Sequence, residues 1–435
     1  MGLSSDRRGN ESRLAAYVEG LTRALGHADR AGPFRSYCVG LLLPGDRKSV
    51  EPMAACVAPE RAQAAHQSLH HFIAKAEWSD DAVLTAVRSH VLPVMQRHGK
   101  IRGWMIDDTG VPKKGTHSVG VARQYCGRLG KQDNCQVAVT LSVAGDNASL
   151  PIAHRLYLPQ AWADDPARRT RAGVPNDVAF LTKPQIALAQ IRAALEAGVP
   201  PAPVLADAGY GVDTDLRDGI TELGLRYIVG IQSSASLWPP GAGPLPPKPW
   251  SGRGRPPSLL QRTAEHQPLA AKQVATTLPR RGWRKVTWRE GSNAPLASRF
   301  AALRVRAAHR DYWRATPRPE EWLLIEWPAS EPEPTKYWLA TLPETTTLRV
   351  LVNLAKLRWR IERDYQDLKQ ELGLGHYEGR GWRGFHHHAT LCIAAYGLLV
   401  AERAAIPPSA EWRPPSLPAP ALPESYRPRG AADPA

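Results

Sequence analysis

The amino-acid sequence predicts an α/β protein in which a mixed sheet with flanking helices is interrupted by a mostly β insertion and preceded by a helical region. Three observations carry this prediction. Apolar residues recur at helical spacing before residue 98, short apolar runs and helices alternate over 99–235, and a proline-rich basic stretch over 236–345 precedes a second helical region over 346–405. Strands in succession, followed by strands alternating with helices, are typical of a mixed α/β sheet.

Residues 1–98 are predicted to form a helical domain. Leu14, Val18, Leu21 and Leu25 follow one another at spacings of four, three and four residues, as on one face of a helix. We expect this domain to bind DNA. A helical bundle that only packs on the rest of the chain is the alternative.

The region 99–235 is predicted to hold the first part of the sheet. Apolar or alternating runs at 103–110, 136–145 and 149–159 indicate three strands, and the turn sequence Gly-Asp-Asn-Ala joins the last two. The segments that follow are predicted to be a helix at 183–198, a strand at 203–206, a helix at 214–224 and a strand at 225–232.

The region 236–345 breaks this alternation. Its first part is proline-rich, and its later runs indicate strands at 284–290, 302–308, 322–327 and 336–341. Between Lys248 and Arg314 there are 15 Lys and Arg residues against 3 Asp and Glu. Because several tryptophans lie among these cations, a nucleic-acid surface is favoured over a merely solvated one. The residues expected to contact DNA here are Arg280, Arg281, Arg284 and Lys285.

A strong helix is predicted over 346–375, at the start of a helical region that covers 346–405. Its leucine and isoleucine residues step by three, four, seven and four along one face: Leu354, Leu357, Ile361, Leu368 and Leu372. A further helix is predicted from about residue 385 to 404. The tail at 406–435 is rich in proline and is predicted to be disordered.

Composition limits the class of protein. The chain has 435 residues and a formal net charge of +15, which favours a polyanionic partner such as nucleic acid. No apolar run approaches the roughly 20 residues of a membrane span. The five cysteines form no C-x-x-C pair, which argues against a disulfide framework and a zinc knuckle. We therefore expect a cytoplasmic protein that binds no membrane.

Carboxylates stand at three places where they would face a common site. Asp107 and Asp108 end the first predicted strand, and Asp207 ends a later strand before a glycine turn. Active sites of open α/β sheets lie at the carboxyl ends of strands. Glu362 lies on the final helix, where Arg358 and Lys369 share its face.

The chemistry of these acids favours a metal site. Each acid taken singly also fits a turn, a cap or a surface ion pair, but the ordered set in a basic chain is more specific. Three carboxylates at one point repel one another unless cations pair with them. Mg²⁺ prefers a few carboxylates together with phosphate oxygens, and two such ions about 4 Å apart activate the attacking oxygen and stabilise the leaving one. Arg358 and Lys369 are then expected to hold substrate phosphates.

The same residues resemble those of bacterial insertion-sequence transposases of the DDE class, which have an RNase H-like core. The matches are IDDTG around Asp108, LADAGYG around Asp207 and the final helix around Glu362. On that helix, Arg358, Glu362 and Lys369 fall on the Arg, Glu and Lys of the signature Y-x2-R-x3-E-x6-K of the cut-and-paste branch. The resemblance covers about residues 36–402.

The resemblance implies an RNase H-like sheet with an inserted β domain, and a triad of Asp108, Asp207 and Glu362 that holds two Mg²⁺ ions, with Mn²⁺ able to substitute. Asp107 competes for the first position, because adjacent strand residues face opposite ways. The family places the acid directly before Thr, which favours Asp108. Ala355 stands where the family has a Tyr that helps to hold DNA near a flipped end base.

The implied function is a transposase that binds the terminal inverted repeats of its element, cuts there and joins the 3′ ends to target DNA, with a hairpin formed at the cut end. Because two ends must meet, we expect a homodimer in the DNA complex. A domesticated protein that only binds DNA and a metal-dependent nuclease without strand transfer are the alternatives.

Overall fold

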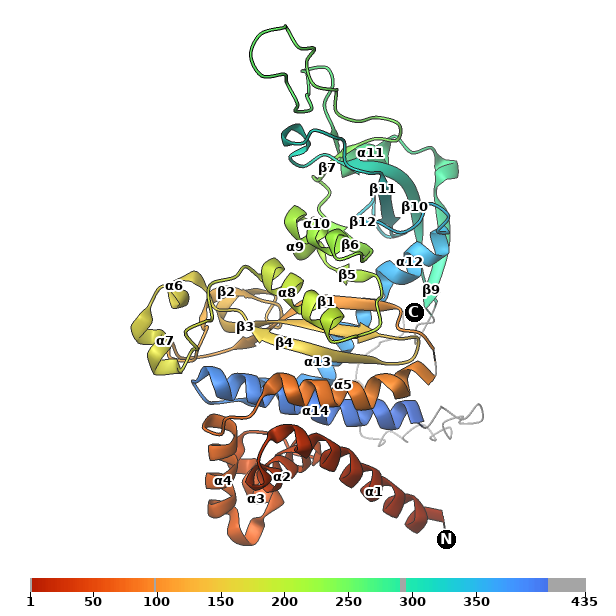
Figure 1. Ribbon diagram of the computed structural model, residues 1–435. Coiled ribbons are helices and arrows are strands. Elements are labelled where there is room, and N and C mark those ends of the chain that lie inside the picture. Colours follow the sequence, from red (N-terminus) through yellow and green to blue (C-terminus); the bar gives the residue numbers. More distant parts are fainter. Residues whose placement is uncertain (1, 98, 290–294, 406–435) are drawn as a thin grey trace, which may run out of the picture.

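The computed structural model describes residues 2–97, 99–289 and 295–405. The predicted disordered tail at 406–435 lies outside these residues. In the described chain, twelve strands form one sheet, and helices cover both faces of its first half (Figure 1). No described helix has the length and hydropathy of a membrane-spanning segment.

The N-terminal region is helical, as predicted. Its helices are α1 (Gly2–Thr22), α2 (Ala31–Leu42), α3 (Val50–Val57), α4 (Ala62–Ala74) and α5 (Asp80–Arg97). Figure 1 shows α5 lying along α14 (Trp382–Ala405) beneath the sheet, whereas α1 to α4 lie beyond this layer. His387 of α14 stacks on Trp78 at 3.6 Å between ring centroids and joins the two regions.

The first part of the sheet follows the predicted order. Its strands are β1 (Gly103–Pro112), β2 (Ala122–Cys126), β3 (Lys131–Ala144), β4 (Ser149–Leu156), β5 (Val204–Ala206) and β6 (Tyr227–Ile231). β3 pairs with β1 and β4 in antiparallel fashion, while β5 is parallel to both β1 and β6. This mixed sheet confirms the predicted RNase H-like fold class. The short strand β2, whose residues alternate in exposure, was not predicted.

Short helices connect these strands. They are α6 (Gln160–Ala163), α7 (Pro166–Ala172), α8 (Lys183–Glu196), α9 (Ala208–Gly211) and α10 (Thr214–Glu222). Thr182 and Gln185 form a capping box that begins α8, with the two reciprocal hydrogen bonds of that motif. Gln190 of α8 donates from Nε2 to the carbonyl of Val139 in β3 at 3.0 Å, so this helix covers one face of the sheet.

The inserted strands continue the same sheet. The insertion comprises β7 (Ser236–Trp238), β8 (Leu269–Ala270), α11 (Ala271–Thr276), β9 (Arg284–Arg289), β10 (Leu296–Ala307), β11 (Glu321–Trp327) and β12 (Lys336–Ala340). β12 pairs with β6 of the first half, through Tyr337 opposite Ile231. The insertion is therefore joined to the core by backbone hydrogen bonds and not only by its connecting loops.

The helix predicted over 346–375 is divided in two. α12 (Leu348–Lys356) is followed by α13 (Trp359–Gln370). Between them, Arg360 donates to the carbonyl of Leu357 and Ile361 to that of Arg358, so the backbone bonds tighten to the i to i−3 type. The chain thus changes direction beside Arg358, one turn before Glu362.

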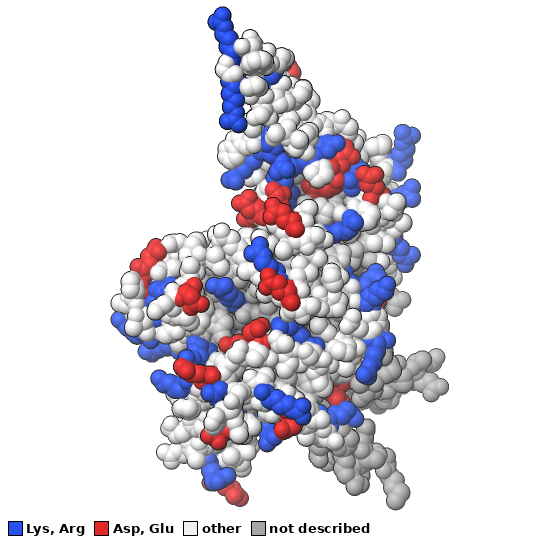
Figure 2. Space-filling view, viewed as in Figure 1, with Lys and Arg blue, Asp and Glu red and all other residues white. Residues whose placement is uncertain are grey.

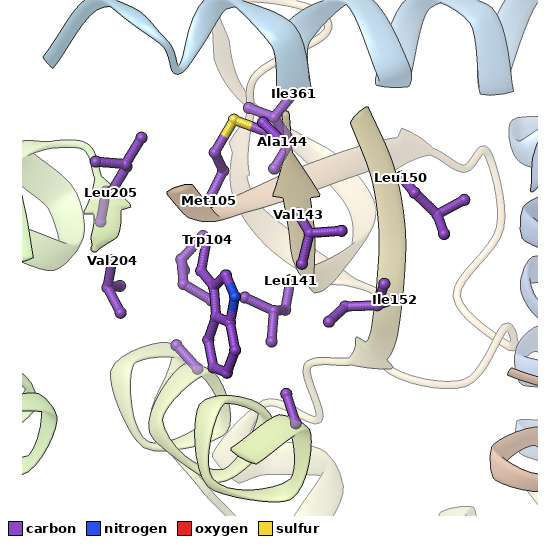
Figure 3. Close-up of a cluster of buried hydrophobic side chains, with 14 of the residues drawn as sticks. Trp104, Met105, Leu141, Val143, Ala144, Leu150, Ile152, Val204, Leu205 and Ile361 are labelled. Atoms are coloured by element: carbon purple, nitrogen blue, oxygen red, sulfur yellow. The ribbon is translucent and has the colours of Figure 1, made fainter. Parts of the chain in front are cut away.

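The core lies on both faces of β1. Figure 3 shows Met105 directed toward Ile361 of α13, while Trp104 points to the opposite face. Trp104 and Met105 are both fully buried, and Trp104 Nε1 donates to the carbonyl of Pro200 at 3.0 Å. Side chains of β1 with odd numbers therefore face α13, and those with even numbers face away from it.

Candidate active site

The register of β1 and β5 places Asp107 beside Asp207. Met105 pairs with Leu205, so continuing the parallel register by two residues on each strand brings the two aspartates opposite one another. Residues two apart share a face of the sheet. Figure 3 shows Met105 directed toward Ile361 of α13, so by this alternation Asp107 and Asp207 lie on the face that carries α13.

Asp107 is a desolvated carboxylate held by a cation. Its Oδ2 accepts a hydrogen bond from Arg358 Nη2 at 2.9 Å, and its Oδ1 accepts one from the backbone N of Asp108 at 2.8 Å. Burial raises the pKa of Asp107 to about 6, although the Arg358 guanidinium opposes this shift, and the carboxylate of Asp207 adds to it. The two aspartates therefore interact directly through their charges.

Asp108 lies on the other face of the sheet. Its Oδ2 accepts a hydrogen bond from Lys183 Nζ at 2.6 Å, at the beginning of α8. The sequence predicted that Asp108 would lie together with Asp207 and Arg358. The structure instead places Asp107 beside these two residues. Alternation along β1 was visible in the sequence, whereas the face that carries the glutamate helix was not.

Asp207 ends β5 and caps α9. Its Oδ1 accepts a hydrogen bond from the backbone N of Tyr210 at 3.2 Å. The following turn packs directly on β6: a Cβ at Gly211 would lie 1.9 Å from the carbonyl O of Gly230, and a Cβ at Gly230 would lie 2.8 Å from the N of Ala208. Close backbone contact therefore requires glycine at Gly211 of the turn and at Gly230 of β6, and this contact holds the turn that follows Asp207 against the sheet.

Glu362 lies in the first turn of α13 and is exposed. It lines a cavity of about 410 Å³ together with Asp207 and Arg358. The remaining walls come from α12, α13, β6 and β12 and include Ala355, Trp359, Ile231, Tyr337 and Trp338. The helix thus presents its glutamate to the strand-end aspartate across an open space, with Ala355 in the wall.

Lys369 lies two turns beyond Glu362 on α13. Its Nζ lies 5.5 Å from the ring centroid of the buried Tyr365. Burial lowers the pKa of Lys369, with Arg128 acting in the same direction, while the carboxylates of Asp107 and Asp108 oppose this. Lys369 therefore lies within electrostatic reach of the strand-end acids.

The donor groups fit a hard cation. In the ranges that the structure describes, no three His, Cys, Asp or Glu side chains come together as a ready metal site. Asp207 and Glu362 in the cavity wall and Asp107 at the neighbouring strand end nevertheless all offer carboxylate oxygens, the ligands that Mg²⁺ prefers. Burial, and then the carboxylate of Asp108, raise the pKa of the Tyr210 hydroxyl, with Tyr365, Asp107 and Asp207 acting in the same direction.

The predicted basic cluster lies elsewhere. Arg280, Arg281, Arg284 and Lys285 are all exposed, in or just before the edge strand β9. Figure 2 shows Lys and Arg side chains along the edge that β9 forms in Figure 1. Arg289 of the same strand lies 4.1 Å from the ring centroid of Trp359 and so connects this edge to the helix that carries Glu362.

Comparison with known proteins gives two similarities. Residues 20–295 match the family described as DDE superfamily endonuclease. Over 202 residues, the chain is 32% identical to a protein of Microchaete diplosiphon described as a probable transposase for insertion sequence element IS701. This match covers 46% of the chain and 49% of that protein, so the chain spans about half the length of the relative.

Proposed function

The chain belongs to the DDE superfamily of endonucleases, and from this premise we propose that it is a DNA transposase that binds the terminal inverted repeats of its element, cuts there and joins the 3′ ends to target DNA. The observation that carries the proposal is the pair of strand-end aspartates, Asp107 and Asp207, on the sheet face covered by the helix of Glu362. The description of the IS701 relative supports the same activity.

The proposed acids are Asp107, Asp207 and Glu362. They would hold two Mg²⁺ ions, with Mn²⁺ able to substitute, and these ions would supply activation of the attacking oxygen and stabilisation of the leaving one. Asp107 takes the place first expected for Asp108, because its carboxylate is the one that interacts with Asp207 and Arg358. Asp108 is the competing assignment.

Arg358, the N-cap residue of α13, and Lys369 within α13 have a role other than metal binding in this proposal. Arg358 holds Asp107 in place and lines the cavity, so it is available to a phosphate that enters beside the acids. Lys369 supplies a second cation along the same helix. The basic edge formed by Arg280, Arg281, Arg284 and Lys285 would bind DNA phosphates away from the cavity. Two copies of the chain would bring the two transposon ends together.

A labelled terminal-repeat duplex, incubated with the protein, Mg²⁺ and a target plasmid, tests the proposal. A transposase releases cut ends and also transfers label into the plasmid. Cut ends without transfer would instead identify a nuclease, and binding without cutting would identify a DNA-binding protein. Metal-free incubation is the control, since it should leave binding intact while cleavage stops.

A further inference from the structure

A loop between Leu245 and Gln261 projects from the insertion, at the end of the molecule opposite to α1–α4 (Figure 1). Every residue from Lys248 to Leu259 is exposed. Leu245 and Gln261 exchange two backbone hydrogen bonds of 2.9 and 3.0 Å, which close the loop at its base. We refer to residues 246–260 as the arm.

The base of the arm is fixed by a buried ion pair. Arg262 Nη2 donates to Asp311 Oδ1 at 2.5 Å, and the Asp311 side chain is only 1% exposed. Trp238 Nε1 donates to the other oxygen of the same carboxylate at 2.6 Å. The arm is therefore an exposed segment on a well-anchored support.

The arm carries only positive charge. It contains Lys248, Arg253 and Arg255 and no Asp or Glu. Within the part of the chain that the structure describes, neither arginine makes a hydrogen bond, an ion pair or a ring contact. Figure 2 shows basic side chains extending from this end of the molecule into solvent. Two unpaired guanidinium groups are thus presented to an external anion.

The spacing of the two arginines leaves no bulk between them. Gly254 separates them, and Gly252 and Gly254 adopt φ angles of 82° and 71°, a conformation that other residues rarely take. A Cβ at either glycine would meet no atom within 4 Å. Internal packing therefore leaves the backbone between the arginines open to a partner. Pro256 and Pro257 restrict the chain that follows to extended conformations.

A narrow groove of duplex DNA is the surface that fits this shape. The minor groove is about 6 Å wide, whereas the major groove, at about 12 Å, admits a helix or a two-stranded ribbon. Tracts of A·T pairs narrow the minor groove further and strengthen its negative potential, which attracts inserted arginines. A G·C pair adds an amino group to the groove floor.

We propose that the arm inserts Arg253 and Arg255 into the minor groove of A·T-rich duplex DNA. This contact is separate from the catalytic cavity and rests on the proposed function only in taking DNA as the partner. Binding in the presence of EDTA therefore tests it apart from cleavage. If the protein cuts transposon ends but shows no preference among duplexes, the proposed function stands and the minor-groove contact of the arm is rejected.

The test uses the full-length chain and three duplexes of equal length, with a central tract of A·T, G·C or inosine·C pairs. Inosine lacks the 2-amino group, so inosine·C pairs present a minor groove like that of A·T and the major-groove hydrogen-bonding edge of G·C. We expect the A·T and inosine·C duplexes to bind roughly tenfold more tightly than the G·C duplex. Equal binding to all three, or inosine·C binding at the G·C level, would overturn the proposal.

Variants separate groove insertion from simple charge attraction. Gly254→Val changes no charge but adds bulk between the arginines and disfavours the backbone conformation that presents them, so it should abolish the preference, while Ser258→Val in the same arm should keep it. Arg253→Ala combined with Arg255→Ala should lose roughly tenfold on the A·T and inosine·C duplexes and little on G·C. Arg280→Ala with Arg281→Ala removes the same charge and should weaken all three alike. An arm variant that also weakened all three alike would reveal phosphate contact only and reject the groove assignment.

Discussion

Arg358 donates a hydrogen bond to Asp107 across 2.9 Å and so joins the break between α12 and α13 to the first strand of the sheet. The two residues are 251 positions apart, and each side chain is 18% exposed. The guanidinium limits the cost of holding a carboxylate in a desolvated place. This ion pair fixes the helix so that Glu362, one turn further on, lines the cavity opposite Asp207.

Loss of Arg358 or Lys369 should slow cleavage while DNA binding is retained. Misplacement of a reacting strand by about 1 Å can cost on the order of a hundredfold in rate, and Arg358→Ala and Lys369→Ala should each approach this. Hairpin formation should suffer most, because it needs a sharply distorted end. A denaturing gel of end-cleavage products measures both. Arg363→Ala, on the same helix but paired with Asp367, is the control. Wild-type rates in the two test variants would contradict the prediction.

The basic edge should govern the salt dependence of binding. For a protein bound to duplex DNA, the slope of log K against log salt changes by about 0.9 for every phosphate that a cation neutralises. Charge reversal at Arg280, Arg281, Arg284 and Lys285 should therefore make this slope markedly shallower in titrations with a terminal-repeat duplex. If the slope of the variant equals that of the wild type, this edge of the sheet does not face DNA.

Lys356 should anchor the insertion to the end of α12. Its Nζ lies 2.5 Å from Glu326 Oε2 and 4.4 Å from the ring centroid of Trp288, and the Glu326 side chain is only 4% exposed. Lys356→Met leaves the glutamate buried without its partner, which should cost about 3–5 kcal/mol in the free energy of unfolding. Adding Glu326→Leu should restore most of the free energy of unfolding that Lys356→Met loses. Urea unfolding checks this, and equal destabilisation of the single and double variants would refute it.

Two histidines, His154 and His388, should make the fold sensitive to acid. Burial lowers the pKa of His154 to about 3 and that of His388 to about 4. Below their ordinary pKa of 6.5, the unfolded chain binds protons that the folded chain does not. The free energy of unfolding should therefore fall from pH 6.5 toward pH 4, by roughly 1.4 kcal/mol per pH unit for each histidine. In unfolding titrations at several pH values, His154→Leu should reduce the pH dependence of the free energy of unfolding by the contribution of one histidine. An unchanged pH dependence would contradict this prediction.

Much of the fold follows from local patterns. Apolar runs and turn residues predicted β1, β3, β4 and the alternation that follows them, because those strands are buried and end at clear breakers. The short strand β2 was missed since its side chains alternate in exposure without an apolar run. The break at Leu357 was also not predicted, because the apolar stripe continues through it. At the end of α12, Lys356 donates a hydrogen bond to Glu326 of the insertion, a long-range contact that the local pattern does not contain.

The candidate site was partly predictable. Asp207, Arg358, Glu362 and Lys369 follow from strand ends and helical spacing. Which of Asp107 and Asp108 shares a sheet face with Asp207 and α13 does not follow, because alternation shows only that the two face opposite ways. Which face receives α13 depends on long-range packing, such as that of Met105 against Ile361, and no local pattern contains it.

Cleavage by paired single variants tests the central claim most directly. Asp107→Ala and Asp108→Ala are compared on a labelled terminal-repeat duplex with Mg²⁺, with binding measured in parallel. We expect Asp107→Ala to abolish cleavage, as Asp207→Ala and Glu362→Ala should, because each removes a proposed metal ligand. Asp108→Ala, which frees Lys183 on the other face, should still cut the duplex. Normal cutting by Asp107→Ala, with none by Asp108→Ala, would contradict the assignment of the site.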